Sequence, residues 1–180
     1  MNFERIVDRV RKLHEHVPGF DPANGNESAK VLFVLEAPGP GAVKSGIISV
    51  NNNDPSARNF SKQMQEAGIE PEQIAIWNIV PWYIGNGAKI RAANAADIKE
   101  GASWLAEVIN AMPNLETIVL VGEKARGAHV AISQHAVMPI LSIHHPSAQS
   151  MNGSSERWED NVAVLKNVAR RCLNRGGRRQ

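Results

Sequence analysis

The stretch VLFVLEAPGPG, Val31 to Gly41, decides the fold of this chain. Its first five residues, Val31 to Leu35, are all apolar, which is typical of a strand that is covered on both faces of a sheet. Glu36 and a run of Pro and Gly follow, a composition that predicts neither a longer strand nor the start of a helix. We therefore expect a shaped loop with one acid at a strand's carboxyl end, where open α/β sheets bind ligands. An ordinary strand-to-helix turn is the alternative.

Three further apolar segments predict strands, over residues 74–80, 117–121 and 137–143. Helical periodicity predicts amphipathic helices over residues 2–16, 56–67, 98–112, 124–133 and 158–172. Ser56 is the expected N-cap of the second helix and Gly68 its end, while Asp97 with Glu100 predicts a capping box. Strands separated by helices need crossover connections. The pattern therefore predicts an α/β fold, a three-layer α/β/α sandwich around a four-stranded, mostly parallel sheet.

The length and composition indicate one globular domain. The 180 residues are 43% hydrophobic and 21% charged, and we divide them into a single domain, residues 1–173, and a basic C-terminal tail, residues 174–180. Cys172 is the only cysteine, which excludes an internal disulfide and a thiolate metal cluster. With no apolar run of the ~18 residues that a membrane span needs and no signal-peptide core, we expect a cytoplasmic monomer without membrane contact. The arginines of the tail suit an anionic partner, although a solvated tail is the commoner explanation.

Parallel strands place their carboxyl ends at one edge, so we expect the Glu36 loop, residues 78–83 and the His145 loop to form a pocket there. The amide of Asn78, inside an apolar strand, can pair with a planar group that presents a donor beside an acceptor, such as the edge of a pyrimidine. His145 can donate a hydrogen bond to an oxyanion. The aromatic candidates for stacking on a base are Trp77, Trp82, Tyr83 and Phe60. Each residue also has an ordinary structural explanation, as a capping amide, a satisfied histidine, a surface acid or a core aromatic.

The set and its order resemble the uracil-DNA glycosylase superfamily. Residues 35–39, LEAPG, are similar to the G-E-A-P-G motif of the thermostable iron–sulfur branch, with Leu35 in place of the first Gly, and residues 44–46, KSG, are similar to the K-T-G that follows it. Asn78 falls where those enzymes carry their uracil-reading Asn. Residues 145–147, HPS, match the last motif, with Ala148 where many members have Pro. The resemblance covers residues 31 to 152.

This resemblance implies a DNA glycosylase of base excision repair that hydrolyses the N-glycosidic bond of uracil, or of another deaminated base, after flipping the nucleotide out of DNA. His145 would be catalytic, with Glu36 or Asp54 holding the water, because the acids that usually follow the first motif are absent here. The expected base-binding residues are Asn78, Ala37 and Phe60. The expected DNA contacts are Ser147, Lys44 and Arg91, with Gln149 or Met151 as a wedge. Without the four cluster cysteines we expect no iron–sulfur cluster, no metal and no other cofactor.

Two other readings stay open. The missing acids allow a catalytically weak or inactive nucleic-acid-binding protein of the same fold. An unrelated α/β nucleotide enzyme is the third reading, but neither G-x-G-x-x-G nor G-x-x-x-x-G-K-[ST] occurs in the sequence. Ser147 is not expected as a nucleophile, because no G-x-S-x-G surrounds it.

Overall fold

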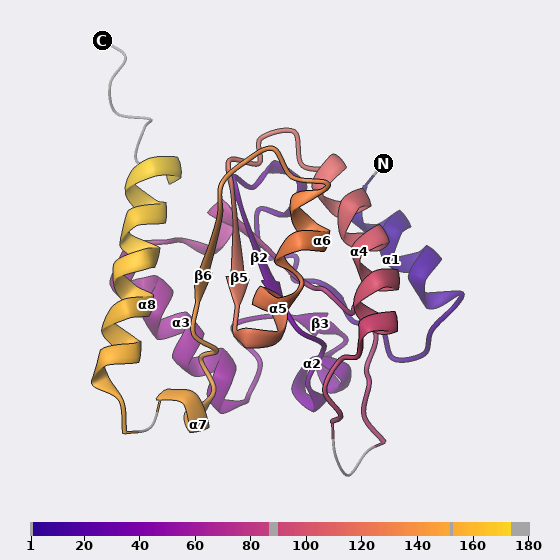
Figure 1. Ribbon diagram of the computed structural model, residues 1–180, viewed down its shortest axis with the longest axis horizontal. Coiled ribbons are helices and arrows are strands. Elements are labelled where there is room, and N and C mark those ends of the chain that lie inside the picture. Colours follow the sequence, from indigo (N-terminus) through magenta and orange to yellow (C-terminus); the bar gives the residue numbers. More distant parts are fainter. Residues whose placement is uncertain (1, 87–89, 152, 174–180) are drawn as a thin grey trace.

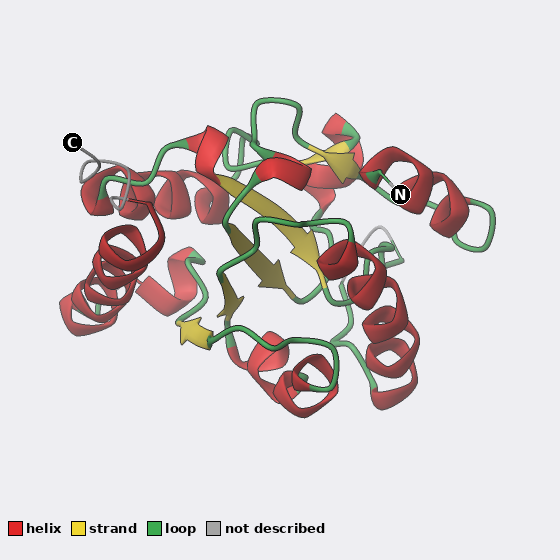
Figure 2. Cartoon of the chain, turned by 90° about the horizontal axis from the view of Figure 1, so that it is seen from above, coloured by secondary structure: helices red, strands yellow, loops and turns green. Residues whose placement is uncertain are grey.

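The computed structural model describes residues 2–86, 90–151 and 153–173, and it confirms the predicted α/β fold. In this part of the chain the central sheet has four strands, all parallel, in the order β4-β2-β5-β6. Helices cover both faces of the sheet (Figures 1 and 2), with α3 packed on α8 and with α4 packed on α1 and α6. The bounds of these elements are β2 (Val31–Leu35), β4 (Ile74–Asn78), β5 (Thr117–Val121), β6 (Ile140–Ile143), α1 (Phe3–Arg11), α3 (Pro55–Ala67), α4 (Ala95–Asn110), α6 (His129–Ser133) and α8 (Ser155–Val168).

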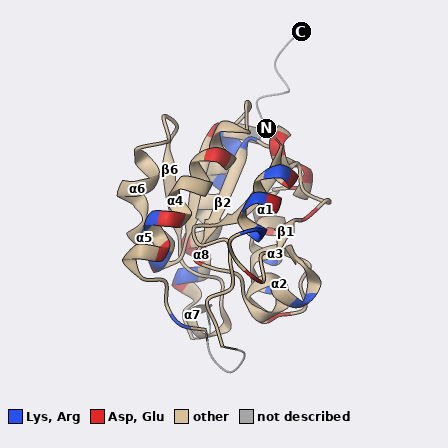
Figure 3. Ribbon diagram, turned by 90° about the vertical axis from the view of Figure 1, so that its right-hand side faces the viewer, with Lys and Arg blue, Asp and Glu red and all other residues tan. Residues whose placement is uncertain are grey.

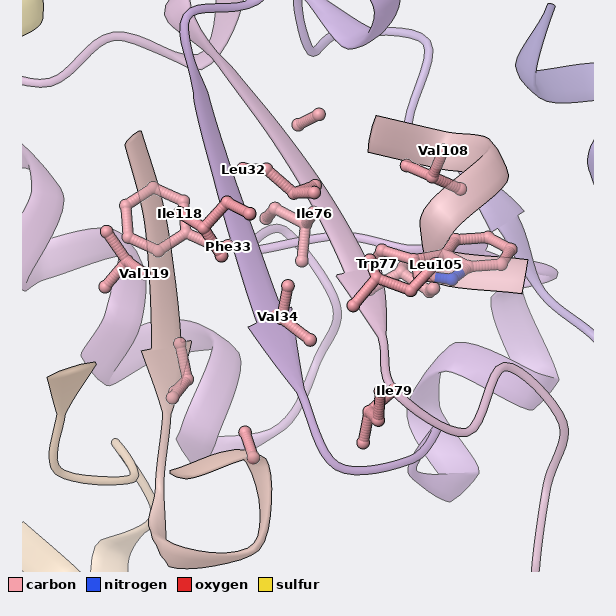
Figure 4. Close-up of a cluster of buried hydrophobic side chains, with 14 of the residues drawn as sticks. Leu32, Phe33, Val34, Ile76, Trp77, Ile79, Leu105, Val108, Ile118 and Val119 are labelled. Carbon is pink, nitrogen blue, oxygen red and sulfur yellow. The ribbon is translucent and has the colours of Figure 1, made fainter. Parts of the chain in front are cut away.

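The core lies against β2, the central strand of the sheet. Residues 31–34 have no exposed surface, as expected for a strand with helices on both faces. Figure 4 shows buried side chains of β2, β4 and β5 together with Leu105 and Val108 of α4. Burial of each such side chain contributes about 1.5–3 kcal/mol. The packing on both faces of the sheet fixes the register of its strands.

Smaller elements complete the chain. Two short strands, β1 (Gly19–Phe20) and β3 (Ile47–Ile48), form a second, two-stranded parallel sheet, which the sequence did not predict. The other small elements are η1 (Asn26–Ser28), α2 (Pro40–Ser45), η2 (Pro71–Gln73), α5 (Glu123–Gly127), α7 (Ala148–Met151) and η3 (Ala169–Leu173). None of the described helices is both long enough and apolar enough to span a bilayer.

The structure corrects the prediction for the segment after β2. The Pro and Gly run does start a helix, since α2 begins at Pro40 with Gly39 as its N-cap. Proline suits the first helical position because its fixed φ is already helical and its missing N–H is not needed there. The N-cap of α3 is Asp54 and not Ser56, because Asp54 Oδ1 accepts the N–H of Ala57 at 2.9 Å.

Other predicted bounds also shift. The capping box of α4 pairs Asn94 with Asp97, and not Asp97 with Glu100. The helix predicted over 124–133 is divided into α5 and α6, and the strand predicted over 137–143 begins only at Ile140, directly after Pro139. The first helix ends at Arg11, short of residue 16. The last predicted helix begins earlier, at Ser155, and ends in a short π-helix, η3.

Candidate functional site

A cavity of about 400 Å³, called here the edge cavity, opens at the carboxyl edge of the sheet. Its size falls in the range of small-molecule sites, about 300–1,000 Å³. The ends of β2 and β4, helix α2, β3, the first turn of α3 and the loop after β6 form its walls. Six residues singled out in the sequence line it: Glu36, Ala37, Asp54, Phe60, Asn78 and His145. The register explains part of this convergence, since Leu35 of β2 pairs with Asn78 of β4.

Asn78 is the last residue of β4 and is 1% exposed. Its Nδ2 has no hydrogen-bond partner among the described residues. A buried amide donor without a partner costs free energy, so such groups are rare unless a ligand completes them. The edge cavity is the space that Asn78 lines. The Nδ2 group of Asn78 is therefore suited to donate a hydrogen bond to a carbonyl oxygen of a ligand in the edge cavity.

His145 lies two residues beyond the end of β6. The N–H of Ser147 donates to its Nδ1 at 3.1 Å. Because Nδ1 accepts this bond, the proton of the neutral ring is assigned to Nε2, which leaves Nε2–H as a donor. Burial lowers the pKa of His145, while the negative charges of Glu36 and Asp54 act in the opposite direction. The ring is thus held neutral near pH 7, as a hydrogen-bond donor and not as a cation.

Gly122 makes room for His145. It follows β5 with a φ of +87°, a conformation that side chains rarely adopt. A Cβ at this position would lie 3.0 Å from Cβ and 3.2 Å from Cδ2 of His145. The backbone conformation therefore favours glycine, and a side chain would also make His145 shift by a few tenths of an ångström.

Two carboxylates border the edge cavity, and main-chain N–H groups hold both. Glu36 Oε1 accepts the N–H of Ala93 at 2.8 Å, and Asp54 Oδ1 accepts the N–H of Ala57 at 2.9 Å. Asp54 Oδ2 lies beside Gly41, where a Cβ would come within 3.0 Å of it. Each acid therefore keeps one oxygen that these two bonds do not use. That oxygen could accept a hydrogen bond from a water.

Phe60 and Ala37 belong to the apolar wall of the edge cavity. Phe60 is 3% exposed and meets Phe33 edge to face, with ring centroids 5.1 Å apart. The other aromatic candidates lie elsewhere. Trp77 stacks on Phe20 in the core, and Trp82 stacks on the ring of His14.

Buried amides that the sequence analysis missed hold the loop that carries His145. Asn161 of α8 accepts the N–H of His144 at 2.7 Å and donates to its carbonyl oxygen at 3.0 Å. Asn161 also donates to Gln63 Oε1 at 3.2 Å, and both side chains are fully buried. Asn59 of α3 donates to the carbonyl oxygen of Pro146 at 2.9 Å. The only sequence signal was a polar residue beside the apolar face of each helix.

The residues expected to contact DNA lie outside the edge cavity. Lys44 is exposed at the end of α2, and Gln149 is exposed on α7. Met151 is 8% exposed, and its Sδ accepts a hydrogen bond from Gln63 at 3.3 Å, so Gln149 is the member of this pair that solvent reaches. Ser147 Oγ accepts the N–H of Ser150 at 3.3 Å.

Arg91 is exposed but is not free of partners. Its two terminal nitrogens bind both carboxylate oxygens of Asp97, which lowers the pKa of Asp97. The predicted C-terminal tail, 174–180, lies outside the described residues. In the described part of the chain no three His, Cys, Asp or Glu side chains gather as metal ligands.

The fold and the edge cavity define an α/β protein with a small, largely apolar site that a buried amide and a neutral histidine border. The family model of the uracil DNA glycosylase superfamily matches residues 22–168. The chain therefore belongs to the uracil DNA glycosylase superfamily.

A solved structure supports the fold. It is the solution NMR structure of a protein from Methanosarcina acetivorans that is provisionally described as a uracil DNA glycosylase. The match has a TM-score of 0.55 and 15% sequence identity, and it covers 84% of this chain and 98% of the other. A search of curated proteins found no significant match.

Proposed function

We propose that the protein is a DNA glycosylase that hydrolyses the N-glycosidic bond of uracil, or of another deaminated base, in DNA. Membership of the superfamily supports a glycosylase-type hydrolase in general. One observation carries the finer proposal: the unpartnered, buried Nδ2 of Asn78 lines the same cavity as the neutral ring of His145. An amide can recognise a base edge, and an imidazole N–H can stabilise a leaving base.

In the proposed reaction the target nucleotide leaves the stack and its base enters the edge cavity. The amide of Asn78 pairs with the base, its Nδ2–H donating to O4 and its Oδ1 accepting from N3–H. Phe60 and Ala37 belong to the apolar surface that contacts the ring. As the bond between C1′ and N1 breaks, negative charge develops on the base, and Nε2–H of His145 donates to O2.

Water completes the hydrolysis. Its oxygen forms the new bond to C1′, and its proton balances the charge of the departing base. Glu36 and Asp54 are the two acids of the edge cavity that could orient this water. Glu36→Gln and Asp54→Asn variants, compared in single-turnover kinetics, identify the acid, because the one that holds the water loses more activity.

The test uses oligonucleotides that each carry one uracil, hypoxanthine, xanthine or G·T mispair. Abasic sites are scored by strand cleavage in alkali. We expect excision of at least one of these bases by the wild type and strong loss in His145→Ala. If none of the substrates yields abasic sites above the level of the His145→Ala variant, the glycosylase proposal is wrong.

A catalytically inactive nucleic-acid binder is the second candidate. The observation that favours it is that both acids of the edge cavity already accept a main-chain N–H. Tight binding of a uracil-containing oligonucleotide without excision would support this alternative.

A further inference from the structure

A second cavity, of about 290 Å³, lies next to the edge cavity and shares Glu36 and His145 with it. We call it the basic cavity. Three cationic side chains line it: Lys124 and Arg126 from α5 and Arg157 from α8. Figure 3 shows the Lys and Arg positions in blue, including those of α5. Elements far apart in the sequence thus bring positive charge to a space that borders His145.

Among the residues that the structure describes, these cations have no acidic partner. None of the three forms a salt bridge with a described carboxylate. Arg157 donates to the carbonyl oxygen of Ser150 at 3.3 Å, which leaves its charge uncompensated. The acids that line the basic cavity are Glu36, which is bound to the N–H of Ala93, and the exposed Glu123. Like charges brought together without a counter-ion repel each other, and an anion between them would relieve that repulsion.

The lining of the basic cavity also indicates which kind of anion fits. None of its described lining residues is Trp, Tyr or Phe, so it offers no aromatic surface on which a nucleobase could stack. Lys and Arg are the side chains that bind phosphate oxygens best, through charge-assisted hydrogen bonds. A compact phosphate group therefore suits the basic cavity better than a base does.

We propose that the basic cavity binds one phosphodiester of the DNA strand whose base enters the edge cavity, an inference that rests on the proposed function. Phosphate contacts fix the register of a protein on a nucleic acid without reading its sequence. A phosphate held by Lys124, Arg126 and Arg157 beside His145 sets which nucleotide of the strand faces the edge cavity. The two cavities then act as one nucleotide site, with the base in the edge cavity and the backbone in the basic cavity.

The test measures affinity for an undamaged oligonucleotide over a range of salt concentrations, so that it does not depend on excision. The triple variant Lys124→Ala, Arg126→Ala, Arg157→Ala is compared with the wild type. All three residues are at least partly exposed, and circular dichroism checks that the variant is folded. If the cations share one phosphate, the slope of log K against log salt falls by about 0.7 on single strands or 0.9 on duplex. Lys62→Ala and Lys166→Ala, exposed on α3 and α8, are the matched controls and should keep the wild-type slope.

Two results would overturn the inference. An unchanged slope in the triple variant means that the three cations do not contact DNA. A fall about three times larger means that they contact three separate phosphates, and the single-phosphate site is wrong.

A second arm separates the possible sources of the phosphate. Inorganic phosphate is added to the wild type and to the triple variant. If it displaces the oligonucleotide from the wild type more readily than from the triple variant at equal ionic strength, the DNA backbone occupies the basic cavity. If it binds the wild type alone but leaves the oligonucleotide bound, the basic cavity binds a free phosphate ion, and the backbone assignment fails. The excision assay decides the proposed function separately. A slope that responds to the variant in a protein without excision activity would refute the glycosylase and leave the phosphate site in place.

Discussion

Asn161→Ala tests how the loop that carries His145 is held. The substitution removes three hydrogen bonds, two to the main chain of His144 at 2.7 and 3.0 Å and one to Gln63 Oε1 at 3.2 Å. Gln63 is fully buried, so its oxygen is left without a partner, whereas the half-buried His144 regains some contact with water. An unsatisfied buried group costs about 1–3 kcal/mol, and with the two His144 groups discounted we expect a loss of about 2–4 kcal/mol. For a chain of this size that loss lowers Tm by roughly 4–16 °C.

Urea unfolding, followed by tryptophan fluorescence, measures the loss of stability. Single-turnover excision at a temperature where the variant stays folded measures the displacement of His145, which should lower the rate without changing DNA affinity. Asn161→Asp keeps the acceptor for the His144 N–H but places a buried carboxylate against two carbonyl oxygens, so it should destabilise the protein at least as much as Asn161→Ala. Asn167→Ala, on the same helix and without a described side-chain partner, is the control. A loss below about 1 kcal/mol, or a full rate in folded Asn161→Ala, would refute the idea that this amide positions the catalytic loop.

Three further predictions rest on the proposed function. His145→Ala should lower single-turnover excision roughly a hundred- to a thousand-fold with little change in DNA affinity, and His144→Ala should do less; the reverse order would make His144 the catalytic histidine. Asn78→Asp should shift excision from uracil toward cytosine, because a carboxylate cannot donate to O4 but accepts from the cytosine amino group; unchanged uracil excision would make the amide structural. The neutral form of His145 is the active one, so excision should fall as the pH drops through its lowered pKa. Glu36→Gln removes a charge that raises this pKa and should move the acid limb of the pH–rate profile to lower pH; a shift to higher pH would contradict the assigned protonation state.

The strands and the order of their loops could be predicted from the sequence because buried strands leave a local signal. Five consecutive apolar residues identified β2, and the helices between strands implied crossovers and hence a parallel sheet. Parallel topology alone then brought Glu36, Asn78 and His145 to one edge. The start of α2 at Pro40 was missed because Pro and Gly were interpreted as breakers, although proline is compatible with a first turn.

The buried hydrogen bonds that hold the His145 loop could not be predicted from the sequence. Asn161 and Gln63 are separated by 98 residues, and each stands on a helix where a polar residue normally faces water. Only the packing of α3 against α8 shows that both are buried and paired. The salt bridges of charged side chains are equally hard to predict from the sequence. Sequence alone cannot tell that Arg91 binds Asp97 while Lys124 and Arg126 form no salt bridge with a carboxylate that the structure describes.

The position of His145 poses a geometric problem that Gly122 solves. Asn78 ends β4 and His145 follows β6, the two outer strands of the four-stranded sheet. Three strand spacings separate those outer strands, roughly 14 Å, yet both residues line the edge cavity. The histidine must therefore lean across the end of β5, and it is the backbone of Gly122 that it meets there. A side chain at this position would strain the backbone, whose φ is +87°, and would make His145 shift by a few tenths of an ångström. Gly122 thus lets His145 pack closely against the end of β5, although nothing in the sequence around this glycine marks it as functional.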